Sequence, residues 1–242
     1  MRTAVIIMSR IPQPGLTKTR LTAVLSDKES SAFHRACLAD ICRTVIKSQL
    51  PGCIYYTGSY EDFRFASDKR GIWGFTQNEL DYFEMYPQQG DNLGERLYNA
   101  ADEMLTRYEA VLLIGSDMPD ISHGLLLAAR EKLLNNDIVI GPATDGGYYL
   151  LAVKQADPYI FRDIAWGTSE VLEKTLEKVK DRNRKFSLLE SKSDIDTWDD
   201  LISFYCRGQS NANQLDAYLY AENMVVKYGI SERGIQRVKK DN

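Results

Sequence analysis

The chain has 242 residues, of which 44% are hydrophobic and 26% are charged, and its formal net charge is -4 at pH 7. This length and balance fit one compact domain, with or without an appendage, and exclude a disordered chain. The acidic balance, without a dominant basic stripe, argues against nucleic acid as a partner.

The cysteines and the apolar runs indicate a reducing compartment. The four cysteines form no C-x-x-C pair, and no histidines flank them at the spacing of metal ligands. They are Cys37, Cys42, Cys53 and Cys206. We therefore expect reduced thiols in place of a zinc site or a disulfide framework. The opening run Ala4–Met8 is too short for the apolar region of a signal peptide, and no long uncharged span follows. These features predict a cytoplasmic protein without a membrane partner.

Short apolar runs alternate along the chain with segments of helical periodicity. Strands are expected over Thr3–Met8, Cys53–Thr57, Asp81–Tyr86, Ala110–Ile114, Asp137–Ile140, Tyr148–Val153 and Phe186–Leu189. Helices are expected over Asp27–Gln49, Asn92–Tyr108, Ser122–Leu134, Thr168–Arg182 and Trp198–Tyr205, with a short helix and an irregular connection over Tyr60–Gly74. The alternation predicts an α/β three-layer sandwich with a mostly parallel central sheet and right-handed crossovers.

The composition changes after Arg207 to a polar run. We therefore expect a domain over residues 1–207 and a C-terminal helical appendage over residues 208–242. The amphipathic stretch Leu215–Tyr228 either packs back onto the domain or forms a homodimer contact. The basic end Arg233–Lys240 is expected to be a solvated tail.

The loop after the first strand carries two cations, Lys18 and Arg20. It is not a P-loop, because Pro12 and Thr17 stand where that motif needs glycine. An ammonium group and a guanidinium group both suit contacts to phosphate oxygens. The alternative interpretation is a pair of surface cations in a loop.

Asp117 follows the strand Ala110–Ile114. Gly115 permits close approach of a ligand, and Pro119 stiffens the exit of the loop. A carboxylate at this place suits magnesium, which proteins usually hold with one or two carboxylates plus substrate phosphates. The alternative is a turn aspartate that caps the following helix.

Two later segments add carboxylates. Asp145 precedes Gly146 and Gly147, whose backbone allows positive φ or N–H groups directed at an oxygen-rich ligand, although Asp-Gly is also a strong hairpin signal. Asp194 and Asp196 precede the last predicted helix, so either caps it or completes a metal site with Asp117.

The ordered series of motifs is more specific than any one of them. It comprises PQPGLTKTRL at Pro12–Leu21, QGDNLGER at Gln89–Arg96, GSDMP at Gly115–Pro119, GPATDGGYYL at Gly141–Leu150, IAWGT at Ile164–Thr168 and DIDT at Asp194–Thr197. From about Ala4 to Phe204 the chain resembles the bacterial nucleotidyl- and glycosyltransferase-A-like family of nucleotide-diphospho-sugar transferases, which is related to molybdopterin and phospholactate guanylyltransferases.

This resemblance implies a glycosyltransferase-A-like sheet with a nucleotide-binding N-terminal half. It also implies that Lys18 and Arg20 bind the triphosphate and that Asp117 binds magnesium. The chain departs from related families at two places: Ser9–Pro12 replaces a small-residue G-x-G run, and Ser116–Pro119 has one carboxylate where glycosyltransferases carry D-x-D.

The expected activity is that of a transferase dependent on Mg²⁺ or Mn²⁺. Glycosyl transfer from a nucleotide-sugar to a small-molecule acceptor comes first, and transfer of a nucleotidyl group from a nucleoside triphosphate to a phosphorylated small molecule is the alternative. A nucleotide-sensing module without turnover is the alternative of another class. In glycosyl transfer Asp145 becomes a candidate base on the acceptor side.

The candidate site follows from these roles. Lys18, Arg20, Asp117 and Asp145 are the catalytic candidates, and Asp117 and Asp196 are the metal candidates. The candidates for nucleotide or substrate binding are Gly15, Thr19, Gly94, Arg96, Gly115, Ser116, Gly146, Gly147, Trp166 and Thr168. Trp166 and Thr168 would form an acceptor wall, although a partly buried tryptophan at a helix entrance is also common. His34 and His123 receive no role.

Overall fold

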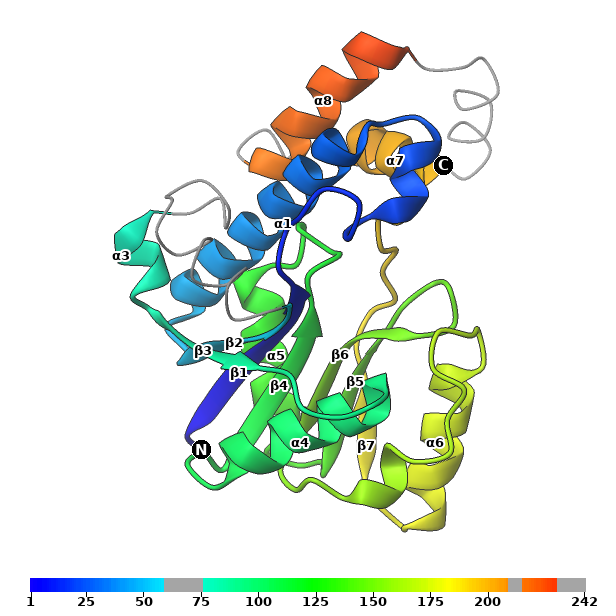
Figure 1. Cartoon of the computed structure of the whole chain (residues 1–242). Helices are drawn as coiled ribbons and strands as arrows, with labels where there is room; N and C mark the ends of the chain where they lie inside the picture. Colours follow the sequence, from blue (N-terminus) through cyan, green and yellow to red (C-terminus); the bar gives the residue numbers. More distant parts are fainter. Residues whose placement is uncertain (59–75, 209–214, 230–242) are drawn as a thin grey trace.

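The computed structural model describes residues 1–58, 76–208 and 215–229. Its centre is a seven-stranded sheet in the order β3-β2-β1-β4-β6-β5-β7 (Figure 1). The strands are β1 (Thr3–Arg10), β2 (Gly52–Thr57), β3 (Phe83–Pro87), β4 (Ala110–Gly115), β5 (Ile138–Pro142), β6 (Tyr148–Val153) and β7 (Phe186–Leu188). Strand β6 runs antiparallel to its neighbours β4 and β5, and the other pairs are parallel. The predicted α/β fold with a mostly parallel sheet is confirmed.

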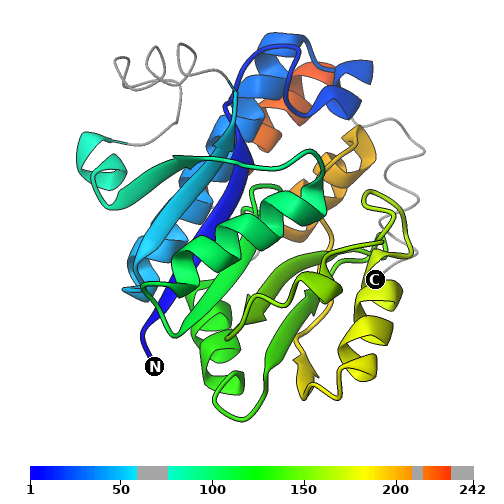
Figure 2. The same ribbon diagram turned by 60° about the horizontal axis from the view of Figure 1, so that its bottom comes forward.

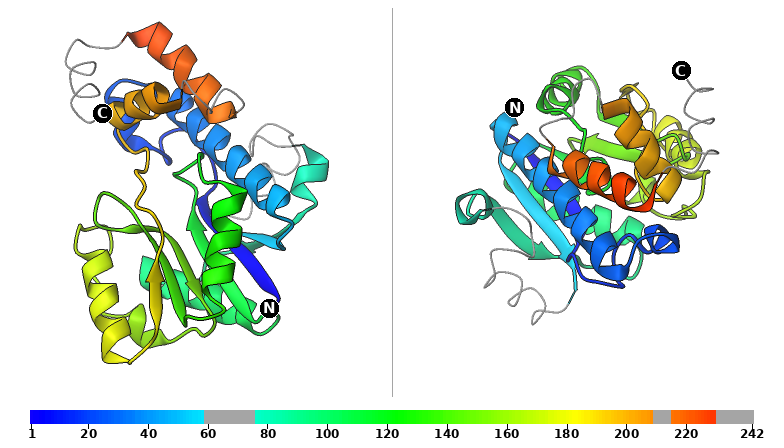
Figure 3. Two further views of the ribbon diagram at one scale, coloured as in Figure 1. Left: turned by 180° about the vertical axis from the view of Figure 1, so that it is seen from behind. Right: turned by 90° about the horizontal axis from the view of Figure 1, so that it is seen from above.

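Helices cover both faces of the sheet. Helices α1 (Asp27–Ser48) and α5 (His123–Lys132) lie on one face, which the view from behind in Figure 3 shows. Helix α4 (Leu93–Leu105) crosses the other face, which α6 (Val171–Asp181) also covers (Figure 2). The remaining elements are η1 (Thr19–Ala23), α3 (Gln77–Leu80), η2 (Pro158–Ile160), α7 (Trp198–Gly208) and α8 (Asp216–Tyr228). Within the described ranges, no helix combines the length and the apolar character needed to cross a membrane.

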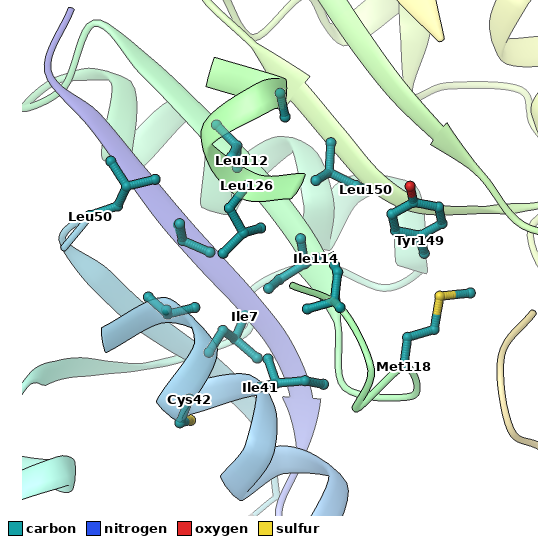
Figure 4. Close-up of a cluster of buried hydrophobic side chains, with 14 of the residues drawn as sticks. Ile7, Ile41, Cys42, Leu50, Leu112, Ile114, Met118, Leu126, Tyr149 and Leu150 are labelled. Atoms are coloured by element: carbon teal, nitrogen blue, oxygen red, sulfur yellow. The ribbon is translucent and has the colours of Figure 1, made fainter. Parts of the chain in front are cut away.

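Alternating side chains of the central strands build an apolar core on each face. Ile7 and Leu112 point toward α1 and α5, where they join Leu126 (Figure 4). Their chain neighbours Ile6 and Leu113 belong to the cluster under α4. Successive strand side chains point to opposite faces, so a strand buried on both faces reads as a continuous apolar run. This is the reason that the strand predictions succeeded.

The antiparallel strand β6 follows from a hairpin with β5. In the connection, Gly146 has a φ of 91°, Ala143 N donates to Gly147 O, and Asp145 Oδ1 accepts from Gly147 N at 2.9 Å. The hairpin interpretation of the Asp-Gly-Gly segment is therefore correct. The hairpin loop lies at the same edge of the sheet as the carboxyl ends of β1 and β4, because β5 runs in their direction.

The predicted helices are present, with shifted ends. Helix α1 begins with a capping box between Ser26 and Glu29. Helix α6 begins at Val171, because the Thr168 hydroxyl donates to Ala165 O in a turn that precedes it. Helix α4 ends at Leu105, three residues before the predicted end. The segments Tyr60–Gly74 and Arg233–Lys240 lie outside the described residues.

Helix α8 packs against α1 and α7, as the view from above in Figure 3 shows. Ala217 and Ala221 of α8 share a buried cluster with Phe33 of α1. The Asp40 carboxylate accepts hydrogen bonds from the first two N–H groups of α8. The amphipathic C-terminal stretch therefore packs back onto the sheet domain, whereas the boundary at residue 207 and a homodimer contact stay predictions.

Candidate active site

A cavity of about 580 Å³ lies at the carboxyl ends of β1 and β4. This is the edge at which open α/β sheets bind ligands. Most of the predicted site residues line this cavity: Lys18, Thr19, Arg20, Arg96, Gly115, Ser116, Asp117, Asp145, Gly147, Trp166, Thr168 and Asp196. The fold thus brings together segments that are far apart in the chain.

Three predicted glycines are not part of this cavity wall. Gly15 lies in the first loop with a φ of 77°. A Cβ on Gly94 would collide with Phe161 O and with the indole of Trp166, and a Cβ on Gly146 would collide with Ser169 O. Gly94 and Gly146 thus permit close packing at these two points, and their contact with a ligand stays a prediction.

Lys18 occupies the centre of the predicted metal site. Its Nζ lies 2.6 Å from Asp117 Oδ1 and 3.2 Å from Asp196 Oδ1, and it donates to Ile195 O. The Lys18 side chain is only 3% exposed, whereas that of Asp117 is 47% exposed. The ammonium group therefore bridges, from behind, two carboxylates that remain accessible from the cavity.

The pKa values reflect this charge balance. Burial alone would lower the pKa of Lys18, but Asp117 and Asp196 raise it above its ordinary value. Burial would raise the pKa of Asp117, but Lys18 and then His34 hold it below its usual range. At neutral pH the site therefore contains an ionised lysine beside the ionised carboxylate of Asp117. Asp194, also on the wall, has a pKa raised to about 6 by burial and by the charges of Asp196 and Asp145.

The DIDT segment is held against the β4 loop by its backbone and by a helix cap. Ile195 N donates to Asp117 O at 3.3 Å. Thr197 and Asp200 form reciprocal hydrogen bonds at the start of α7: Thr197 N donates to Asp200 Oδ2, and Asp200 N donates to the Thr197 hydroxyl. Thr197 therefore acts as the helix cap, which leaves the Asp196 carboxylate at the cavity.

Sequence reasoning missed several wall residues, among them His34, Arg10 and Gln88. His34 is buried in α1, where its neighbours Phe33 and Cys37 indicate only a core-facing helix. Its Nε2 lies 3.3 Å from both Ser9 Oγ and Arg10 O, so it contacts the end of β1. Burial lowers the pKa of His34 below its ordinary value. No local pattern in the sequence signals this contact.

The donor set fits a divalent cation only together with a ligand. Among the described residues, no group of three or more His, Cys, Asp or Glu side chains could hold a metal ion. Asp117 and Asp196 supply two carboxylates, which matches the way in which Mg²⁺ is held with substrate phosphates. The Lys18 ammonium already contacts both of these carboxylates.

Comparison with known proteins supports this interpretation of the fold. Residues 54–168 match the family described as "Uncharacterized protein conserved in bacteria (DUF2064)". The chain is 26% identical over 216 residues to a 2-phospho-L-lactate guanylyltransferase of Methanocaldococcus jannaschii, covering 88% of this chain and 84% of that protein.

Solved structures give the same class. A protein from Desulfovibrio desulfuricans G20, assigned as a nucleotide-diphospho-sugar transferase, superposes with a TM-score of 0.84 at 28% identity, covering 95% of this chain and 99% of that one. A cytidylyltransferase from Leptospira borgpetersenii has a TM-score of 0.53 at 11% identity, with 94% of each chain covered, and shows the fold alone. The resemblance predicted from the sequence is confirmed, and the chain is a transferase.

Proposed function

We propose that the chain transfers a nucleotidyl group from a nucleoside triphosphate to a small phosphorylated acceptor. The observation that carries the proposal is the Lys18 ammonium between Asp117 and Asp196, at a strand end with a single carboxylate. A cation-bearing loop beside a lone strand-end carboxylate suits a polyphosphate, whose charge needs both protein cations and a metal. The guanylyltransferase relative supports the same reaction type.

The reaction needs no nucleophile from the protein. An acceptor oxygen attacks the α-phosphorus in line, the bond from that phosphorus to the bridging oxygen breaks, and pyrophosphate leaves with the electron pair. Catalysis of phosphoryl and nucleotidyl transfer consists mostly of positioning and of electrostatic stabilisation. In this proposal Arg20 contacts the phosphate oxygens and neutralises the charge that develops on pyrophosphate. Lys18, whose ammonium group already donates to Ile195 O and contacts Asp117 and Asp196, balances the charge of these carboxylates.

Mg²⁺, or Mn²⁺ in its place, would be held by Asp117 and Asp196 together with phosphate oxygens. When bound, it would supply charge neutralisation for the polyphosphate. The protein's own contribution is to keep both carboxylates in place. Lys18 does this, because its ammonium group contacts both of them and is fixed by the Ile195 carbonyl.

Glycosyl transfer from a nucleotide-sugar is the second candidate. The similarity over nearly the whole chain to the Desulfovibrio desulfuricans protein favours it. In that reaction Asp145, on the cavity wall, would take the acceptor proton. Its Oδ1 already accepts the Gly147 N–H at 2.9 Å, so a turn-forming role explains the same residue.

Product analysis separates the two reactions. The chain is incubated with Mg²⁺, a panel of phosphorylated hydroxy acids, and either nucleoside triphosphates or nucleotide-sugars. Nucleotidyl transfer releases pyrophosphate and retains the α-phosphate in the product, whereas glycosyl transfer releases a nucleoside diphosphate. The proposal expects pyrophosphate release that is lost in Asp117→Ala while the circular dichroism spectrum is retained. Nucleoside diphosphate release from a nucleotide-sugar would instead establish the second candidate.

A further inference from the structure

The cations of the cavity wall differ in whether a carboxylate already neutralises them. Lys18 contacts Asp117 and Asp196, and the 72% exposed Arg20 lies 3.4 Å from Asp196. Arg10 and Arg96 also line the cavity, yet no ion pair joins either of them to a described carboxylate. Arg10 Nη1 donates to Leu16 O at 3.1 Å in the first loop, so Arg10 lies on the Lys18 side. An arginine without a carboxylate partner in a cavity wall is available for an anion from a ligand.

The Arg96 guanidinium is fixed in orientation. Its Nε donates to Gly90 O at 2.9 Å. This single bond sets the plane of the fork and leaves both terminal nitrogens without a hydrogen-bond partner among the described residues. A planar fork with one anchored nitrogen and two free ones matches two oxygens of a phosphate or of a carboxylate.

The loop that anchors Arg96 is itself held at several points. Gln88 Nε2 donates to Ser9 O at 3.1 Å and to Tyr55 O at 2.9 Å, which ties the loop to β1 and β2. Asn99 Nδ2 donates to Gln89 O, and Asp91 N donates to Glu95 Oε2. The Gly90 carbonyl is therefore presented by a loop whose flanking residues are all hydrogen-bonded.

A glycine at position 90 is required for this arrangement. Its φ is 129°, and an added Cβ would lie 2.7 Å from Glu95 Cβ. Gly90, whose carbonyl oxygen accepts the Arg96 Nε–H, can thus lie this close to helix α4 only because it has no side chain. The position of the guanidinium is built into the loop and into the first turns of α4.

Arg96 and Lys18 come from opposite faces of the sheet. Lys18 precedes η1, which packs against α1, whereas Arg96 belongs to α4 on the other face. Near Arg96 the wall also contains Leu93, which is 43% exposed, and Trp166. The Arg96 side of the cavity thus combines one unpaired cation with apolar surface, while the Lys18 side combines cations with carboxylates.

From this contrast we infer that Arg96 binds an anionic group of the acceptor, a phosphate ester or a carboxylate, while the Lys18 side receives the polyphosphate of the nucleotide. The inference rests on the proposed function, because it assigns the second substrate of that reaction to the α4 side of the cavity. Arg96 thereby restricts the acceptor to small anions. An acceptor that lacks such a group would leave the Arg96 guanidinium unpaired when it binds. Binding of such an acceptor is therefore weaker.

The test measures binding of small anions by calorimetry. Glycerol 3-phosphate probes a phosphate ester, glycerate probes a carboxylate, and inorganic pyrophosphate probes the nucleotide side. The variants are Arg96→Gln, the charge-preserving Arg96→Lys, and the control Arg184→Gln. Arg184 contacts Gln155 on the surface, outside the cavity wall.

We expect Arg96→Gln to weaken glycerol 3-phosphate or glycerate binding about tenfold or more, because a charge-assisted pair is lost. Arg96→Lys should recover part of the loss, and Arg184→Gln should change nothing. Pyrophosphate affinity should stay within about threefold in every variant, and pyrophosphate should not displace glycerol 3-phosphate from the wild type. The probe that Arg96 responds to identifies which anion the acceptor carries.

Three results would overturn the inference. These are unchanged binding of both small anions in Arg96→Gln, an equal loss of pyrophosphate binding in that variant, and no binding of either small anion by the wild type up to about 10 mM. Failure of the proposed function is a separate outcome, since these affinities are measured without turnover. If the chain transfers the nucleotidyl group but Arg96→Gln leaves the KM for the acceptor unchanged, the proposed function stands and the inference about Arg96 is wrong.

Discussion

Lys18 Nζ lies 3.2 Å from Asp196 Oδ1, although the two residues are 178 positions apart in the chain. The contact closes the first loop onto the segment before α7, and Lys18 Nζ also contacts Asp117. Because the ammonium group is buried and the carboxylates are accessible, the positive charge of Lys18 is part of the folded structure. In the proposed metal-bound site, the metal, the lysine and the two carboxylates would form one charge balance.

Replacing Lys18 by methionine should destabilise the chain by about 1–3 kcal/mol, because two neighbouring carboxylates lose their shared cation. Mg²⁺ alone should then raise the melting temperature of Lys18→Met more than that of the wild type, since the metal restores the missing charge. Arg20→Met is the matched control, because Arg20 is 72% exposed and should change stability little. Equal Mg²⁺ effects on Lys18→Met and the wild type would show that no cation replaces the ammonium there.

Asp40 should make stability depend on pH. Burial raises its pKa from 3.8 to about 6, opposed by the hydrogen bonds from Ala217 N and Asp216 N. The folded pKa lies above the unfolded one, so the ionised carboxylate costs stability above about pH 6, and this cost disappears as the pH falls toward the unfolded value. The full effect of a shift of about two pKa units is about 3 kcal/mol.

Urea denaturation of the wild type and of Asp40→Asn tests this effect. The neutral amide has no such titration. The free energy of unfolding of Asp40→Asn, relative to that of the wild type, should therefore be higher at about pH 7.5 than at about pH 4.5. A stability difference that is the same at both pH values would exclude Asp40 as the titrating group.

Gly94→Ala should displace Trp166. The added methyl group meets the backbone of Phe161 and the indole ring, neither of which can move freely. We expect a loss of about 1–3 kcal/mol and a shift in tryptophan emission. Gly115→Ala is the control, because nothing lies within 4 Å of an added Cβ there. If both variants keep the emission spectrum and the stability of the wild type, the packing of Gly94 is not required.

Asp145→Asn separates a turn former from a general base. The amide oxygen still accepts the Gly147 N–H, so the hairpin loop should persist. Nucleotidyl transfer should keep kcat within about tenfold, whereas loss of a general base costs about 100-fold or more. A drop of the larger size in steady-state kinetics, with the fold intact, would favour glycosyl transfer.

The sequence alone predicted the elements because their signals are local. The capping box at Ser26 and Glu29 and the apolar runs of the central strands need no knowledge of the rest of the chain. The gathering of Asp117 and Lys18 at one edge also followed, since parallel strands end together. Ends such as that of α6 were misplaced because the Thr168 hydroxyl forms a turn in place of a cap.

The pairing within the site could not be predicted. Carboxylates neutralise Lys18 but not Arg96. This difference depends on the positions of the DIDT segment and of the loop before α4 in the folded chain. The contact of His34 with the end of β1 depends in the same way on how α1 packs against the sheet. Charges and hydrogen bonds between distant segments are set by tertiary structure, and residue type gives only the candidates.

The most direct test of the metal-dependent polyphosphate site is calorimetric titration of nucleoside triphosphates into the wild type and Asp117→Asn, each with and without Mg²⁺. We expect Mg²⁺ to strengthen binding of at least one triphosphate by about tenfold or more in the wild type, and we expect this gain to disappear in Asp117→Asn. An equal gain in Asp117→Asn, or no effect of Mg²⁺ on any triphosphate in the wild type, would contradict it.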